Sequence, residues 1–218
     1  YGPIAKEDHH SISEILAATG HFYRRTGTIY FIVVLLLTFV FPFTLHSELP
    51  RTDVMWVMLL SGLPGVVNYY FQGKFKILLQ AEGKSYILTN LTTIISILTS
   101  IAKIILLLNG FDIIALQAMY LFFNVAQMLF ITLYMRRNYK WLNLHLSPNY
   151  KAISQSKNAF VHQISSLIFN NTDVLLLTYF CGLSVVSVYS MYTMLFGMIS
   201  TLISNFGGFG FALGQTFN

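Results

Sequence analysis

A stripe of polar side chains interrupts an otherwise apolar run near the carboxyl end of the chain. Its members are His162, Ser166, Asn170 and Asp173, at positions i, i+4, i+8 and i+11. Side chains at this spacing lie on one face of an α-helix. An unpaired carboxylate deep in lipid is costly, so we expect Asp173 to be protonated, paired or facing water. Two interpretations stay open: a pathway for a polar solute, with Asp173 and His162 as the candidate coupling-ion site, or a hydrogen-bonding knot between helices.

A second stripe lies in the apolar run from Tyr86 to Leu108. It consists of Thr89, Thr92, Ser96, Thr99, Ser100 and Lys103, which project within about 100° of one another on a helix. The hydroxyls alone are typical of helix packing in membranes. A lysine within a span costs roughly 2.5 to 3.5 kcal/mol and normally faces a bundle interior or an aqueous cavity. The alternative for Lys103 is that its stem extends past Asn109 to the outer headgroups. We expect Lys103, Ser96 and Thr92 to line a substrate pathway.

Other chemistry is not indicated. The chain has one cysteine, Cys181, which excludes a disulfide framework and a cysteine-based metal site. His9 and His10 beside Asp8 are typical of a solvated patch, and no catalytic triad, acidic pair or phosphate-binding loop is present. The sequence therefore predicts neither an enzyme nor a cofactor or metal site.

The elements that must position both stripes are membrane spans. Hydrophobic residues make up 55% of the chain, charged residues only 10%, and the mean hydropathy is +0.63, whereas charged residues approach a quarter of a soluble domain. Apolar runs near the roughly 20 residues that a bilayer requires occur six times. They are Thr28 to Leu45, Val54 to Phe71, Tyr86 to Leu108, Asp112 to Met135, Ala159 to Phe180 and Val185 to Phe206. The predicted fold is an all-α polytopic membrane helical bundle.

Positive charge predicts the orientation of these spans. All but two of the thirteen Lys and Arg residues lie in alternate gaps between the runs, and such residues stay on the cytoplasmic side. The basic residues are Lys6, Arg24 and Arg25, then Lys74, Lys76 and Lys84, then Arg136, Arg137, Lys140, Lys151 and Lys157. Both ends of the chain are therefore expected in the cytoplasm. The pI of 9.3 follows from topology and lipid contact, so no nucleic-acid partner is predicted.

The longest connection, Arg136 to Asn158, predicts a division into two lobes. We expect residues 1–150 to form part of a first transmembrane lobe, with an interfacial helix over Ile4 to Arg25 and four spans, and residues 151–218 to open a second lobe with two spans. The other connections, His46 to Asp53, Asn109 to Phe111 and Cys181 to Ser184, are very short.

Several short runs resemble a known family when taken in order. They are Gly2 to Asp8, Phe22 to Gly27, Leu78 to Lys84, Lys157 to His162 and Asn170 to Val174. Together they resemble the Gram-positive branch of the Wzx-type polysaccharide flippases, in the superfamily that also contains MATE exporters and lipid II flippases. The resemblance implies 12 to 14 spans in two lobes around a central cavity. It also implies that this chain is a fragment beginning near the end of the second span.

The function that this resemblance implies is a flippase in the cytoplasmic membrane of a bacterium. It would move polyprenyl-pyrophosphate-linked oligosaccharide from the inner to the outer leaflet for capsule or exopolysaccharide synthesis, with a polymerase and assembly proteins as partners. The alternatives are a transporter of another substrate in the same superfamily, such as a drug/ion antiporter or lipid II flippase, and a membrane glycan polymerase. A polymerase needs a sizeable outer loop, which the short connections do not offer.

Overall fold

The computed structural model describes residues 8–44, 50–143, 146–150 and 156–216, with side chains for all of these except 156–164, 167 and 205–216. These ranges contain helices and connections, with no strand among them. The chain divides into two compact units, Tyr1–Thr44 with Leu49–Ala159 as unit 1, and Leu45–Glu48 with Phe160–Asn218 as unit 2. The predicted all-α class is confirmed. The correspondence of these units to two transporter lobes divided at residue 150 stays a prediction.

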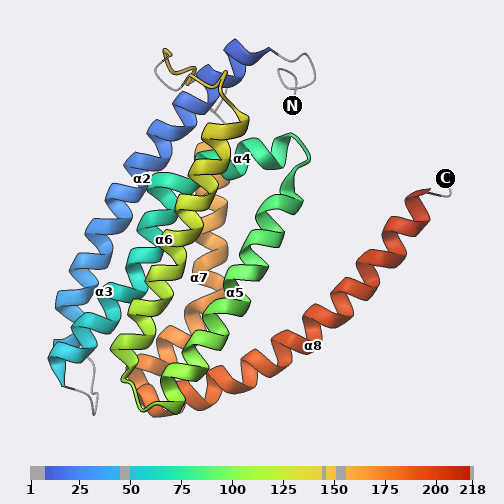
Figure 1. Cartoon of the computed structure of the whole chain (residues 1–218). Coiled ribbons are helices and arrows are strands. Elements are labelled where there is room, and N and C mark those ends of the chain that lie inside the picture. The colour runs from blue at the N-terminus through green and yellow to red at the C-terminus, as the bar shows by residue number, and fades with distance from the viewer. Residues whose placement is uncertain (1–7, 45–49, 144–145, 151–155, 217–218) are drawn as a thin grey trace. The chain divides into compact units, whose positions relative to one another are not determined.

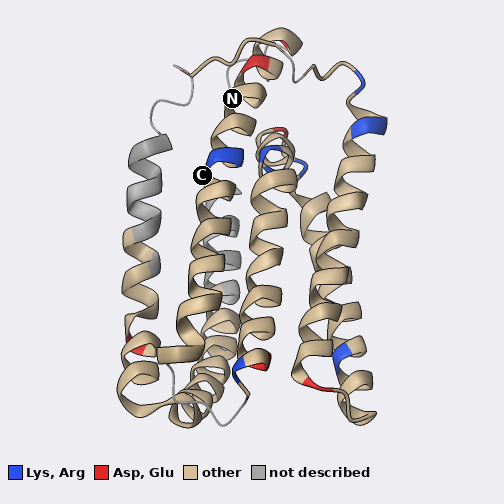
Figure 2. Cartoon of the chain, turned by 90° about the vertical axis from the view of Figure 1, so that its left-hand side faces the viewer, with Lys and Arg blue, Asp and Glu red and all other residues tan. Residues whose placement is uncertain are grey.

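Unit 1 is a bundle of helices (Figure 1). In chain order they are α2 (His9–Thr44), α3 (Arg51–Val67), the π-helix η1 (Asn68–Gln72), α4 (Gly73–Ala81), α5 (Ser85–Leu108) and α6 (Ile113–Asn138). Within the bundle, α2 packs against α3, and α6 packs against both α3 and α5. The short helix α4 runs across one end of the bundle (Figure 1). We call this the basic end, because it carries Arg24, Arg25, Lys74, Lys76, Lys84, Arg136 and Arg137, and Figure 2 shows Lys and Arg gathered there.

The first helix differs from the sequence-based expectation. A separate interfacial helix was predicted over residues 4–25, but α2 continues without a break from His9 through the first predicted span to Thr44. Its 36 residues reach roughly 54 Å at about 1.5 Å per residue, well beyond a hydrocarbon core of about 30 Å. The apolar face at Ile12 and Leu16 is buried in protein. It packs there rather than lying against lipid because α4 and α6 cover it.

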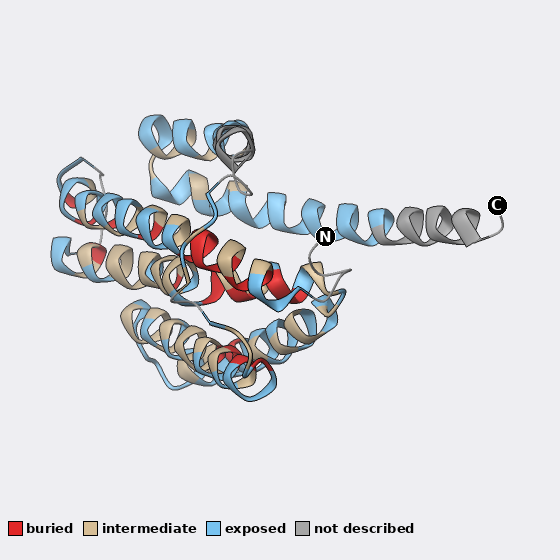
Figure 3. Cartoon of the chain, turned by 90° about the horizontal axis from the view of Figure 1, so that it is seen from above, coloured by how far each residue is buried: buried red, intermediate tan, exposed pale blue. Residues whose placement is uncertain are grey.

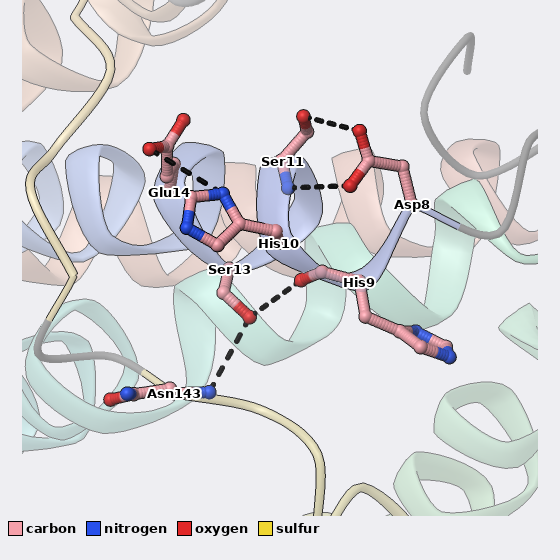
Figure 4. A network of polar contacts seen from close by, with 7 residues as sticks. All are labelled: Asp8, His9, His10, Ser11, Ser13, Glu14 and Asn143. Carbon is pink, nitrogen blue, oxygen red and sulfur yellow. Dashed lines mark hydrogen bonds and ion pairs between the residues drawn. The ribbon is translucent and has the colours of Figure 1, made fainter.

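A polar network fixes the start of α2 (Figure 4). Asp8 accepts hydrogen bonds from the Ser11 amide at 3.0 Å and the Ser11 hydroxyl at 2.6 Å, as an N-cap residue does. These bonds lower the pKa of the Asp8 carboxyl. The backbone N–H of Asn143 donates to Ser13 Oγ at 3.4 Å. The His9 ring lies against Trp141, with ring centroids 4.1 Å apart. The segment after α6 is therefore attached to the first turns of α2.

The buried core of the described residues lies at the basic end. Leu78 and Leu79 of α4 are its most buried members, and the cluster as a whole comprises Ile12, Leu16, Phe75, Leu78, Leu79, Ile131, Met135 and Tyr139. This position has a physical reason. Outside lipid the hydrophobic effect drives burial, whereas within the bilayer apolar side chains are as well solvated by lipid as by protein.

Large apolar side chains cover the outside of the spans. Along α5 alone Ile94, Ile97, Leu98, Ile101, Ile104, Ile105, Leu107 and Leu108 are exposed, and Figure 3 shows exposed residues along every helix. Such a surface is far larger than a soluble monomer tolerates. Five helical segments of the described residues are long and apolar enough to cross a membrane: His9–Thr44, Arg51–Ala81, Ser85–Leu108, Ile113–Asn138 and Leu183–Ser204. The chain is a multi-pass membrane protein.

The second span contains a change of helix type. Pro64 lies inside α3, and the α-helix continues past it to Val67 before the π-helix η1 begins. Lys76 Nζ donates to Asn68 Oδ1 at 2.9 Å and so bridges η1 and α4. The π-helix places Tyr70 and Phe71 beside the basic end.

Unit 2 consists mainly of two helices. They are α7 (Ser156–Cys181) from Phe160 onward, which contains most of the fifth predicted span, and α8 (Leu183–Thr216), which contains the sixth. Only Gly182 separates them, with a backbone φ of +82°, a conformation that glycine adopts without strain.

Candidate functional site

The polar stripe of α5 lines a cavity against α6. The cavity has a volume of about 350 Å³. Its lining comprises Thr92, Ile95, Ser96, Thr99, Ser100 and Lys103 from α5, Tyr120, Asn124 and Gln127 from α6, and Lys76 from α4. From Thr92 to Lys103 this lining extends roughly 16 Å along α5. The hydroxyls and amides of the lining thus lie between two lysines, Lys76 toward the basic end and Lys103 toward the opposite end.

Lys103 faces α6 within this cavity. Its Nζ lies 4.9 Å from the ring centroid of Tyr120, a cation–π distance, and Tyr120 is about two turns into α6. Cα–Cβ bonds tilt toward the helix N-terminus, which in α5 is the basic end, so the lysine stem leans away from Asn109. This geometry favours the cavity over the alternative in which Lys103 extends toward the opposite headgroups.

The remaining polar groups of the cavity divide into two kinds. Gln127 Nε2 donates to Thr92 Oγ1 at 3.1 Å, and the buried Thr99 hydroxyl donates to its own helix backbone; both bonds stabilise helix packing. The hydroxyls of Ser96 and Ser100 make no hydrogen bond to any other described residue. Those two hydroxyls and the Lys103 ammonium are therefore available to a polar ligand.

The stripe of the fifth span lies in unit 2. Asn170 Nδ2 donates to Ser166 Oγ at 3.2 Å, and the Tyr189 hydroxyl of α8 donates to Asp173 Oδ2. Asp173 is thus hydrogen-bonded to a neighbouring helix, and pairing is one of the three states expected for it. A hydrogen-bonding knot between helices requires a contact of this kind. The side chain of His162 lies outside the described residues, and the use of Asp173 and His162 as an ion site stays a prediction.

Sequence reasoning missed three residues of these sites. Tyr120 and Gln127 were not singled out, although they share a face with Asn124 at positions i, i+7 and i+4. Tyr189 was also missed. The only signal was that both residues lie about two turns from Gly182, Asp173 nine positions before it and Tyr189 seven after it.

A hydrogen-bonded clasp closes the basic end of unit 1. Lys84 Nζ lies 2.8 Å from Glu82 Oε2 and donates to the Tyr139 hydroxyl at 3.1 Å, while that hydroxyl donates to Glu82 Oε2. Burial, followed by the bond to Glu82, raises the pKa of Tyr139 to about 12. The bonds to Glu82 and Tyr139 raise the pKa of Lys84 above its usual range. Gly83 makes the turn possible with a φ of +74°.

Comparison with known proteins identifies a family. A family model described as "Polysaccharide biosynthesis protein" matches residues 5–209. The chain belongs to this family. None of the curated proteins and no solved structure matches it.

Two runs that carried the family resemblance have structural roles in this polysaccharide biosynthesis protein. Leu78 to Lys84 supplies two core leucines and most of the clasp. Gly27 allows a close approach of α2 to η1, since a Cβ there would lie 2.8 Å from Tyr70 Cδ2. Both runs therefore stabilise the basic end, and neither lines the cavity between α5 and α6.

Proposed function

We propose that this protein is a flippase that moves polyprenyl-pyrophosphate-linked oligosaccharide from the inner to the outer leaflet during capsule or exopolysaccharide synthesis. The observation that supports it most is the cavity between α5 and α6. It combines free hydroxyls with Lys103 inside a multi-pass protein of a polysaccharide biosynthesis family. In this proposal the protein binds and moves the lipid-linked sugar through non-covalent contacts and catalyses no reaction on it.

Each part of such a substrate has a matching environment. Hydroxyls at Ser96 and Ser100 can exchange hydrogen bonds with sugar, and the Lys103 ammonium can attract the pyrophosphate. The prenyl chain stays in lipid, against the exposed apolar side chains of α5. With an inside-negative potential, outward movement of negative charge is favourable by roughly 2.3 kcal/mol per charge per 100 mV.

The proposed location is the cytoplasmic membrane of a bacterium, with the basic end of unit 1 in the cytoplasm. The supporting observation is the gathering of Lys and Arg at that end (Figure 2), since such residues resist translocation. The proposed partners are a polysaccharide polymerase and assembly proteins, to which the flipped units would pass.

Replacing Lys103 tests the proposed function. Lys103→Gln should reduce polymer export about tenfold or more at normal protein abundance, because the cavity loses the Lys103 ammonium that would attract the pyrophosphate. Lys103→Arg should retain part of the activity, since the charge survives while the geometry changes. Lys140→Gln, which removes an exposed charge outside the cavity, should export normally.

The leaflet in which precursor accumulates separates a flippase from a polymerase. A defective flippase leaves single lipid-linked repeat units on the cytoplasmic leaflet, whereas a defective polymerase leaves them on the outer leaflet. The measurement is accessibility of the precursor to an impermeant oxidant in intact cells. Normal export by Lys103→Gln, or accumulation on the outer leaflet, would contradict the proposal.

A further inference from the structure

A second cavity lies at the basic end and shares no lining residue with the first. Its volume is about 550 Å³, and it is bounded by α2, η1, α4 and α6. Three cations line it, Arg24, Lys74 and Arg136, together with aromatic walls from Tyr70, Phe71 and Phe75. Neither the proposed transport pathway nor the clasp explains why these charges meet.

The three cations have no acidic counterpart. No carboxylate lines the cavity, and none of the three forms an ion pair with another described residue. Like charges held together destabilise a fold unless an anion neutralises them. They come from three different elements, so helix packing, rather than local sequence, assembles the cluster.

Packing holds part of this cluster in place. The Lys74 stem lies against α2, since a Cβ on Gly20 would come within 3.3 Å of Lys74 Cδ, and its Nζ lies 4.9 Å from the Phe75 ring centroid. Tyr70 shares a 2.5 Å hydrogen bond with Thr28 of α2. The cavity wall is therefore built before a ligand arrives, which lowers the entropy that binding costs.

The position of the cavity indicates a lipid-borne ligand. Each cation lies within a few residues of the end of a predicted apolar run, which begins at Thr28 or ends at Phe71 or Met135. That is headgroup level, where aromatic side chains also gather. Phe71 is half-exposed, so an acyl or prenyl chain can lie along the outer surface while its headgroup enters the cavity.

We propose that this cavity binds the phosphate or diphosphate headgroup of a membrane lipid in the leaflet at the basic end. Arg24 and Arg136 supply guanidinium groups that match phosphate oxygens, and Lys74 supplies a point charge. Basic pockets between transmembrane helices bind anionic headgroups by the same electrostatics. Where the headgroup is the diphosphate of a polyprenyl carrier, the cavity is a loading site, and that assignment rests on the proposed function.

Native mass spectrometry of the full chain in detergent tests this site. The probes are phosphatidylglycerol, a polyprenyl diphosphate without sugar, and phosphatidylcholine as the reference without net charge, each with and without an equal concentration of inorganic pyrophosphate. We expect the two anionic lipids to bind at least tenfold more tightly than phosphatidylcholine. A preference between the two anionic lipids identifies the source of the headgroup.

Charge-matched variants separate the cavity from the general surface. Single changes Arg24→Gln, Lys74→Gln and Arg136→Gln should each weaken binding about fivefold, and the triple variant on the order of a hundredfold. The control is Arg25→Gln with Arg137→Gln and Lys140→Gln, which removes the same charge from exposed residues that do not line the cavity. It should stay within about threefold of the parent. Thermal unfolding of each variant checks that it is folded.

Three results would overturn the proposal. They are equal weakening in the control, binding of phosphatidylcholine as tight as that of the anionic lipids, and full displacement of lipid by inorganic pyrophosphate at equal concentration, which would indicate a soluble ligand. Because binding is measured without transport, a protein that binds anionic lipid but moves no oligosaccharide would refute the proposed function and leave this site standing.

Discussion

At the scale of single residues, the clasp shows that side chains far apart in the sequence can form one hydrogen-bonded group. Glu82 and Lys84 flank the turn before α5, and Tyr139 follows α6, yet the three polar groups form one hydrogen-bonded set. Lys84 Nζ also lies 5.2 Å from the Tyr139 ring centroid. A set of this kind strengthens each of its bonds where water is partly excluded.

The clasp predicts a loss of stability at high pH. The folded-state pKa values of Tyr139, about 12, and of Lys84 both lie above their ordinary values of 10.0 and 10.5. The folded state therefore holds these protons more tightly, so their contribution is complete below about pH 10 and is lost as the pH rises toward 12. Tyr139→Phe should lower the free energy of unfolding by about 1 to 2 kcal/mol at pH 7.

Thermal unfolding in detergent between pH 7 and 12 measures this effect. The difference between the parent and Tyr139→Phe should be constant up to about pH 9.5 and then shrink. Tyr86→Phe, at an exposed tyrosine, is the control and should match the parent throughout. A difference that grows with pH would contradict the assigned proton positions.

Asp173 and Tyr189 allow charge to be separated from hydrogen bonding. Asp173→Asn removes the charge but keeps an oxygen that accepts from Tyr189, so export should fall while abundance stays near normal. Tyr189→Phe removes the bond and should lower stability by about 1 kcal/mol, with export per folded protein largely retained. Ile168→Ala, at an exposed apolar position, should be mild. Loss of folded protein in Asp173→Asn with unchanged export per molecule would leave only the helix-packing role.

At the scale of elements, glycines bring α2 and α3 together. A Cβ on Gly62 would lie 2.5 Å from Val34 Cγ1, and one on Gly65 would lie 2.6 Å from the Tyr30 hydroxyl. Small residues permit this approach, and dispersion contacts then replace the hydrophobic effect, which is absent between helices in lipid. α2 carries Arg24, and η1, which continues α3, carries Tyr70 to the second cavity at the basic end.

Gly62→Ala tests this packing. Overpacking against Val34 should destabilise the protein by about 1 to 3 kcal/mol, measured by thermal unfolding in detergent. Adding Val34→Ala should recover part of the loss, because it removes the atoms that clash. Gly197→Ala, where a Cβ would meet nothing within 4 Å, should be neutral or slightly stabilising. An unchanged Gly62→Ala variant would mean that the helices are farther apart.

At the scale of the whole molecule, charge and apolar surface are segregated. Lys and Arg gather at the basic end, the buried core lies there too, and the described spans present apolar side chains along their lengths. A bilayer imposes this distribution, because buried cores form outside it and unpaired charge is excluded from it.

Cysteine labelling in intact cells tests the proposed orientation. In a Cys181→Ala background, Ser47→Cys and Phe111→Cys should react with an impermeant reagent from outside, and Lys140→Cys should be protected. Phe111 is preferable to Gly110, whose φ of +74° disfavours a side chain. External labelling at position 140 in unbroken cells would reverse the orientation.

The sequence by itself determined the class of the protein, the approximate limits of its helices and the residues that share a face of one helix. These properties are local, since lipid requires every backbone group to bond within its own helix and side-chain periodicity then follows. Thr92, Ser96 and Lys103 could therefore be grouped from spacing alone, as could the stripe through Asp173.

Only the tertiary structure decided which faces meet. It placed Lys103 over Tyr120, Asp173 against Tyr189, and Lys84 beside Tyr139, and it buried the first turns of α2 that were expected to lie on lipid. The physical reason is that helices in a membrane associate through close packing and specific hydrogen bonds. Those contacts depend on pairs of side chains from different helices, which the periodicity of a single helix does not encode.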